Sequence, residues 1–165
     1  NDGSRDYEFI KSLVNESESI NFNLISNNFN KDDFNKDVNL FNGSWVENKI
    51  SDEEIKNFYH DADLTIIPLI DTLQPSGQSV ALQSIACGTP VLITKTSGFW
   101  DPTKFKNKNN IIFFEKNETN LWLEEIETLH KNKLLMSTLI ENGLKTIEEN
   151  YRLKNFYKNL KIHLE

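Results

Sequence analysis

The sequence predicts an α/β domain with a Rossmann-like, three-layer arrangement around a mainly parallel sheet. Short apolar runs alternate along the chain with longer stretches of helical periodicity, as expected when strands and helices follow one another. One run, Val91–Ile93, is apolar at every position, which is typical of a strand buried on both faces of a parallel sheet. The 165 residues suffice for one domain with a real core, so we expect a single domain over residues 1–165.

Each expected element follows from its local pattern. Apolar or β-rich runs predict strands at 21–26, 38–42, 64–69, 91–93 and 110–115. Turn residues at 1–4 precede an amphipathic helix, and Ser51 with Glu54 forms a capping box that opens another. Further helices are expected at 78–87, 120–130, 131–150 and 151–164. Because an α/β domain should open with a strand, we expect the first strand to be missing and the chain to be a fragment.

Composition and charge narrow the function classes. A net charge of -7 argues against general nucleic-acid binding, because nucleic-acid phosphates would be repelled. The single cysteine, Cys87, rules out an internal disulfide and fits a reducing compartment. No apolar run approaches the roughly 18 residues that a membrane-spanning helix needs. We therefore expect a cytoplasmic protein.

The segment around residue 77 carries the clearest turn and helix signals. Pro75 cannot lie inside a helix, and Ser76 or Gly77 can cap one, so a helix of about three turns is expected at Gln78–Cys87. Gly88 then ends the helix as a left-handed cap. The strand at 91–93 follows directly.

The start of this helix is an expected anion site. Its free N–H groups and positive dipole end face the loop that follows the strand at 64–69. Ser79 and Gln83 are four residues apart and lie on one helix face. Backbone donors, a hydroxyl and an amide together suit a phosphorylated, hydroxyl-rich ligand. In the alternative interpretation, Ser76 only caps the helix and Gln83 is a surface residue.

The residues Q-P-S-G-Q-S-V-A-L-Q-S-I-A-C-G-T-P-V-L-I-T resemble the donor-binding segment of the family 4 retaining glycosyltransferases, which have the GT-B fold. That segment typically reads E-P-F-G-x-x-x-L-E-A-M-A-x-G-x-P-V. The resemblance covers most of the chain and implies the C-terminal, nucleotide-sugar-binding half of such an enzyme. It implies transfer of a hexosyl group to a glycan or lipid-linked acceptor, in polysaccharide biosynthesis, without a metal or other cofactor.

The resemblance also implies roles near the N-terminus and in the second glycine loop. Arg5, which follows the turn containing Gly3, aligns with the family's diphosphate-binding Lys, and its guanidinium can bind a diphosphate as a bidentate fork. The alternative is a solvated arginine, which the dipole at a helix start mildly disfavours. Gly43, Ser44 and Trp45 are expected near the nucleotide base, although a lid over the core is an equal interpretation of Trp45.

The sequence departs from the two acidic residues of the family. The second aligns with Gln83, which can still hold ribose hydroxyls because an amide both donates and accepts. The first has no counterpart, because Pro75 stands where the family spacing, counted back from Gln83, would place it. Gln74 is the nearest substitute, Gln74 or Gln78 is expected to hold sugar hydroxyls, and Asp71 is a reserve carboxylate. The predicted donor-binding residues are Gly3, Arg5, Ser44, Gln74, Ser76, Gly77, Gln78, Ser79 and Gln83.

The resemblance implies an acceptor-binding N-terminal domain that this chain lacks, to which the helix at 151–165 would cross. The apolar face of that helix is then expected to be exposed or to form an oligomer contact. We expect the chain alone to transfer no sugar, and peripheral membrane association of the full enzyme stays open. A degenerate, non-catalytic nucleotide-sugar-binding module is the main alternative, and a sugar-nucleotide epimerase of the same fold is a weaker one.

Overall fold

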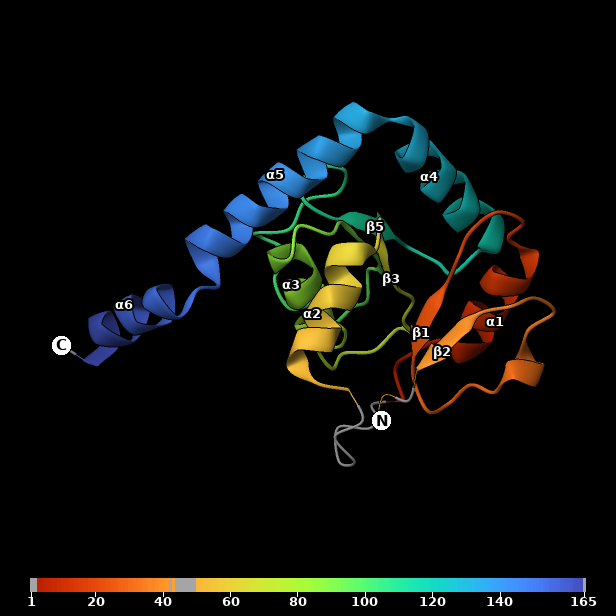
Figure 1. The fold of residues 1–165 in the computed structure, drawn as a ribbon. Coiled ribbons are helices and arrows are strands. Elements are labelled where there is room, and N and C mark those ends of the chain that lie inside the picture. The colour runs from red at the N-terminus through yellow and green to blue at the C-terminus, as the bar shows by residue number, and fades with distance from the viewer. Residues whose placement is uncertain (1–2, 42, 44–49, 165) are drawn as a thin grey trace.

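A computed structural model describes residues 3–41, 43 and 50–164 (Figure 1). The helices are α1 (Tyr7–Glu16), α2 (Asp52–Asp61), α3 (Gln78–Ala86), α4 (Thr119–Lys131), α5 (Lys133–Asn150) and α6 (Leu153–Leu164). The strands are β1 (Asn23–Ile25), β2 (Asn39–Phe41), β3 (Thr65–Ile67), β4 (Val91–Thr94) and β5 (Ile112–Phe114). Every expected helix and strand is confirmed, and the segment between β1 and β2 contains a short 3₁₀ turn, η1 (Lys31–Asp33).

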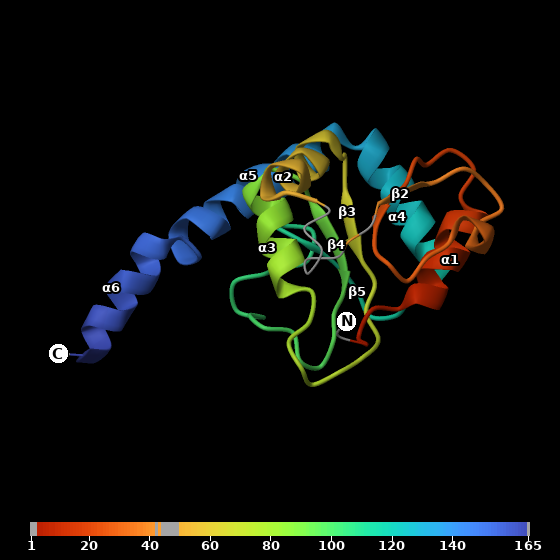
Figure 2. The same cartoon turned by 60° about the horizontal axis from the view of Figure 1, so that its bottom comes forward.

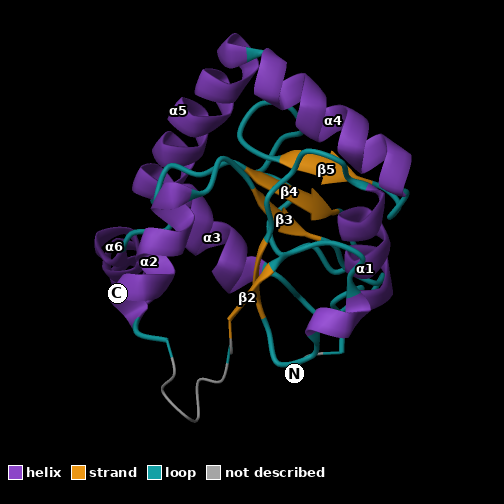
Figure 3. Cartoon of the chain, turned by 45° about the vertical axis from the view of Figure 1, so that its right-hand side comes forward, coloured by secondary structure: helices purple, strands orange, loops and turns teal. Residues whose placement is uncertain are grey.

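The fold class is also confirmed, because all strand pairs are parallel and helices cover both faces. Strands β3, β4 and β5 form one sheet, with Ile66 opposite Leu92 and Leu92 opposite Ile112. Figure 3 shows this sheet between α3 and α5 on one side and α1 and α4 on the other. The domain therefore has the predicted three layers.

The single sheet that we expected is divided in two. β1 pairs with β2 in a separate parallel sheet, with Leu24 opposite Leu40. Within the described residues no strand joins β1 to β3, so each has one edge without a strand partner. The two sheets consequently flank a space that the sequence pattern did not predict.

Strand β4 is buried on both faces, as its uniformly apolar sequence predicted. Leu92 packs into a core with α1 and α4, where Trp122 is fully buried and stacks on Phe114 with ring centroids 4.2 Å apart. Val91 and Ile93 pack into a second core with α3 and the segment before β5. The two cores hold the helical layers against the sheet and fix the direction in which α3 points.

The predicted helix ends are also confirmed at two places. Glu54 N donates to Ser51 Oγ at 3.2 Å and Ser51 N donates to the Glu54 carboxylate at 2.8 Å, which completes the capping box of α2. These hydrogen bonds from the Ser51 backbone and hydroxyl lower the pKa of Glu54. Gly88 has φ of +83° and ends α3 in the left-handed region, as expected for a C-terminal glycine.

Helix α6 extends away from the body of the domain at the end of α5 (Figures 1 and 2). It exposes large apolar side chains, with Leu153 at 65% and Phe156 at 59% of their full accessible surface. The expectation of an exposed apolar face on this helix is therefore confirmed. Among the described residues, no helix combines the length and apolar character needed to cross a bilayer.

Candidate functional site

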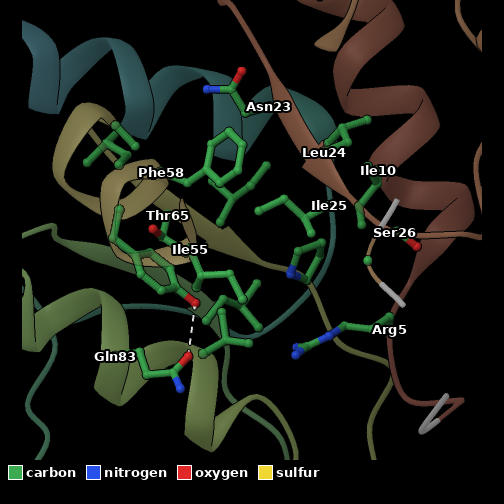
Figure 4. A pocket seen from close by; sticks show the side chains of 18 of the residues that line it. Arg5, Ile10, Asn23, Leu24, Ile25, Ser26, Ile55, Phe58, Thr65 and Gln83 are labelled. Carbon is green, nitrogen blue, oxygen red and sulfur yellow. Dashed lines mark hydrogen bonds between the residues drawn. The ribbon is translucent and has the colours of Figure 1, made fainter. Parts of the chain in front are cut away.

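A cavity of about 340 Å³ lies between β1 and β3, beneath α2 and the side of α3 (Figure 4). Most of its wall is apolar and comes from strand and helix side chains such as Leu24, Ile55 and Ile66. Polar lining groups lie at both ends of these strands: Asn23 and Thr65 begin β1 and β3, whereas Ser26 follows β1 and the cation Arg5 lies beside the segment after β3. In open α/β sheets, ligands bind beyond the carboxyl ends of the strands. The end of the cavity that carries Arg5 is therefore the candidate site.

The backbone on both sides of Arg5 is fixed to the segment that leaves β3. Ile70 N donates to Ser4 O at 2.8 Å, Asp6 N donates to Pro68 O at 3.1 Å, and Arg5 forms an isolated antiparallel bridge with Leu69. This short pairing places the Arg5 side chain in the cavity wall (Figure 4). The chain thus positions a cation where the sheet ends.

The Arg5 guanidinium lies directly beside the start of α3. Its Nη1 atom is 3.2 Å from the position that a Cβ would take on Gly77, the residue that caps this helix. Nη1 is buried and has no hydrogen-bond partner among the described residues. A half-buried guanidinium with a buried, unpaired N–H group next to the positive end of a helix dipole is unfavourable without a counter-ion. Both positive groups therefore suit one anion.

We expected either Ser76 or Gly77 to cap the start of α3, and the structure decides between them. Gly77, with φ of +75°, is the N-cap, and no side chain caps the helix. Ser76 is 5% exposed and its Oγ has no partner among the described residues, so the interpretation of Ser76 as the cap is wrong. Any side chain at residue 77 would press on Ile67 at 3.0 Å, which explains a glycine at this close approach. Ser76 is not among the residues that line the cavity.

The structure brings only part of the predicted set to the cavity. Arg5 and Gln83 both line it, and Gly77 lies against Arg5. Four of the predicted residues are exposed and are not among its lining residues: Gly3, Gln74, Gln78 and Ser79. Ser44, together with Trp45, lies outside the described residues, whereas the neighbouring Gly43 lines the cavity.

Asp71, the reserve carboxylate, is engaged elsewhere. Its two oxygens accept hydrogen bonds from Ser97 N at 2.7 Å and from Ser97 Oγ at 3.0 Å. These bonds favour the ionised carboxylate and lower the pKa of Asp71. Asp71 therefore ties the loop after β3 to the loop after β4 and is not among the residues that line the cavity.

One residue that positions the site was missed by sequence reasoning. Asn117 Nδ2 donates to Asp6 Oδ2 at 2.8 Å and to Leu69 O at 3.0 Å, and Asn117 Oδ1 accepts from Thr94 Oγ1 at 2.6 Å. Asn117 thus ties Asp6, which follows Arg5, and Leu69, the bridge partner of Arg5, to β4. No sequence signal identified it, because asparagine is abundant in this chain and these partners are 111, 48 and 23 residues away.

We predict that Asn117→Ala lowers the free energy of unfolding by about 2 kcal/mol, since three partly buried groups lose a partner at once. Urea denaturation of the variant and the unmodified chain measures the change. Asn109→Ala, on an exposed loop residue, is the control and should change stability by less than about 0.5 kcal/mol. Equal losses in the two variants would contradict a special role for Asn117.

No group of three or more His, Cys, Asp or Glu side chains that could hold a metal ion occurs in the described part of the chain. The site consists of a guanidinium, a helix start and an amide, next to an apolar wall. This donor set suits an anionic group that also carries hydroxyls.

Comparison with known families gives one match that covers more than half of the chain. The model of the family described as "Glycosyl transferases group 1" matches residues 36–146. No curated protein matches the chain in sequence. The family match includes α3, its glycine cap and the strand that follows, but it begins after Arg5.

Solved structures share the fold at low sequence identity. The C-terminal domain of the glycosyl transferase group 1 family protein LpcC from Francisella tularensis has a TM-score of 0.54 and 19% identity, covering 69% of this chain and 54% of that chain. Anabaena Alr3699/HepE in complex with UDP-glucose has a TM-score of 0.70 and 13% identity, covering 97% and 45%. The same protein with UDP and glucose has a TM-score of 0.56 and 16% identity, covering 72% and 32%. The chain thus spans about half or less of these proteins.

Proposed function

Because the chain belongs to the glycosyl transferases of group 1, we propose that it is the domain that binds the nucleotide-sugar donor in a glycosyltransferase. The observation that carries this proposal is the buried, unpartnered Nη1 of Arg5 beside the glycine-capped start of α3. A diphosphate is the part of a nucleotide sugar that such a site suits. HepE, which shares the fold, is described in complex with UDP-glucose, and this supports the same ligand class.

In this proposal the sugar is transferred as the diphosphate leaves. Arg5 and the N–H groups at the start of α3 stabilise the negative charge that develops on the leaving diphosphate. Gln83, which lines the cavity, holds the ribose. We further propose that the reaction is a retaining, metal-independent transfer of a hexosyl group to a glycan or lipid-linked acceptor. These details rest on the resemblance of the segment around Gly77 to the donor-binding segment of the family 4 retaining glycosyltransferases.

The whole enzyme, as we propose it, contains an acceptor-binding domain in addition to this chain. The exposed apolar side chains of α6 supply a surface for that domain. We accordingly propose that the 165-residue chain alone transfers no sugar, and measurable turnover by it would contradict this part.

A second candidate is a nucleotide-sugar-binding module without catalytic activity. The observation that favours it is the amide of Gln83 in place of the family's carboxylate, together with the absence of any carboxylate at Gln74 and Pro75. Fusing an acceptor-binding domain to this chain and assaying transfer distinguishes the two candidates. Transfer favours the enzyme, and tight donor binding without transfer favours the module.

The test of donor binding is a thermal-shift panel with UDP, GDP, ADP and dTDP and their sugars, at neutral pH. A ligand at about 100 times its dissociation constant adds roughly 2.7 kcal/mol to the free energy of unfolding. We expect one nucleoside diphosphate to raise the melting temperature more than the corresponding nucleoside does. The absence of any stabilisation across the panel would contradict the proposal.

A further inference from the structure

Gln83 has a specific neighbour that the sequence pattern did not predict. Tyr59, on the last turn of α2, donates a hydrogen bond from Oη to Gln83 Oε1 at 3.4 Å (Figure 4). Tyr59 and Gln83 come from different helices and both line the cavity. The contact therefore joins α2 to the exposed face of α3 at the edge of the candidate site.

The Tyr59 backbone is anchored and its phenol keeps its proton. The backbone carbonyl of Tyr59 accepts a hydrogen bond from Thr89 Oγ1, which ties the end of α2 to the turn after α3. Burial raises the pKa of Tyr59, and the positive charge of Arg5 opposes that shift only in part. At neutral pH the phenol is thus a hydrogen-bond donor, and the acceptor that it uses is the amide oxygen of Gln83.

This contact orients the amide of Gln83. An amide oxygen accepts up to two hydrogen bonds and the amide nitrogen donates two. The hydrogen bond turns Oε1 toward the Tyr59 hydroxyl, and Figure 4 shows the amide nitrogen on the opposite side of Gln83. A carboxylate at position 83 would have only acceptors on both sides.

We propose that Tyr59 is a positioning residue that holds Gln83 with its amide nitrogen toward the ligand, so that the site selects a ribose oxygen that accepts a hydrogen bond. This inference rests on the proposed function, because the ligand is taken to be a nucleoside diphosphate. In this contact the Gln83 amide donates the hydrogen bond and the ribose oxygen accepts it. A carboxylate at position 83 would make the opposite contact, because it only accepts and so requires a ribose hydroxyl that donates.

The test compares ribose analogues of the nucleoside diphosphate that stabilises the chain most in the thermal-shift panel. An O-methyl ether accepts a hydrogen bond but cannot donate one, and a deoxy sugar does neither. Titration calorimetry with the 2′- and 3′-deoxy and the 2′- and 3′-O-methyl forms gives the ratio of ether to deoxy affinity at each position. The methyl group adds the same bulk in every variant. Comparing the ratio between variants therefore reduces the effect of that bulk on the measured difference.

The expected results differ in sign between two variants. The unmodified chain should bind the O-methyl form at one position about 5-fold more tightly than the deoxy form, and Tyr59→Phe should reduce this ratio to near 1. Gln83→Glu should invert the ratio, because an ether cannot donate to a carboxylate. Tyr157→Phe, which removes an exposed hydroxyl on α6, is the matched control and should leave the ratio unchanged.

The outcomes separate the two proposals. If nucleotides bind but Tyr59→Phe and Gln83→Glu both keep the unmodified ratio, the positioning role is wrong and the proposed function stands. If no nucleotide binds the unmodified chain, the proposed function fails, and the positioning role fails with it. The urea midpoint of each variant shows whether the chain is folded, and Gln83→Glu changes only an exposed side chain.

Discussion

Replacing Arg5 by methionine is expected to weaken binding of a nucleoside diphosphate about 100-fold while leaving the free chain as stable as before. A guanidinium that holds a diphosphate contributes charge-assisted hydrogen bonds worth about 3 kcal/mol, which corresponds to roughly a 100-fold change in affinity. In the free chain Arg5 Nη1 has no partner among the described residues and lies beside the positive end of α3. Its removal therefore relieves an uncompensated charge, and methionine keeps the apolar stem.

The measurement pairs titration calorimetry with urea denaturation of the same preparations. Arg5→Lys is the matched control, because it keeps the charge but loses the bidentate fork, and we expect an intermediate loss of about 10-fold. Higher salt should reduce the difference between the unmodified chain and Arg5→Met, since the contact is ionic. An Arg5→Met variant that binds like the unmodified chain, or that unfolds much more easily, would show that the arginine has a structural role instead.

Gly98→Ala is expected to cause the largest loss of stability, about 3 kcal/mol, and to weaken donor binding as a consequence. A Cβ on Gly98 would lie 2.3 Å from Leu73 O and 2.8 Å from Thr72 O. These are backbone atoms, so no side-chain rotation can relieve the overlap, and overpacking of this kind costs a few kcal/mol. The hydrogen bond from Gly98 N to Thr72 O, at 2.8 Å, would be lost as the loops separate.

The separation would disturb the candidate site because the loop that carries Leu73 leads into α3. Gly88→Ala is the control, since φ of +83° penalises a side chain there but a Cβ would meet no atom within 4 Å. We expect it to cost about 1 kcal/mol and to leave nucleotide affinity unchanged. Urea denaturation and the thermal-shift panel, run on both variants, measure the two effects. If Gly98→Ala is no more harmful than Gly88→Ala, the loop contact does not support the site.

The sequence by itself determined the local elements. Turn chemistry, capping and periodicity are properties of neighbouring residues, so they predicted α2 from Ser51 and Glu54 and the end of α3 from Gly88. The uniformly apolar run of β4 predicted its burial on both faces. The start of α3 could also be proposed as an anion site from the sequence, because free N–H groups and the dipole belong to any helix start.

Only the tertiary structure decided which groups meet at that site. It divided the strands into two sheets, buried Ser76 so that it does not cap α3, and occupied Asp71 with Ser97. It also assigned Asn117 to hold the chain beside Arg5 and Tyr59 to contact Gln83. Each of these contacts joins residues between 24 and 111 positions apart in the chain, or depends on how whole elements pack. Local propensity carries no information about such distances, because packing of the complete chain selects the partners.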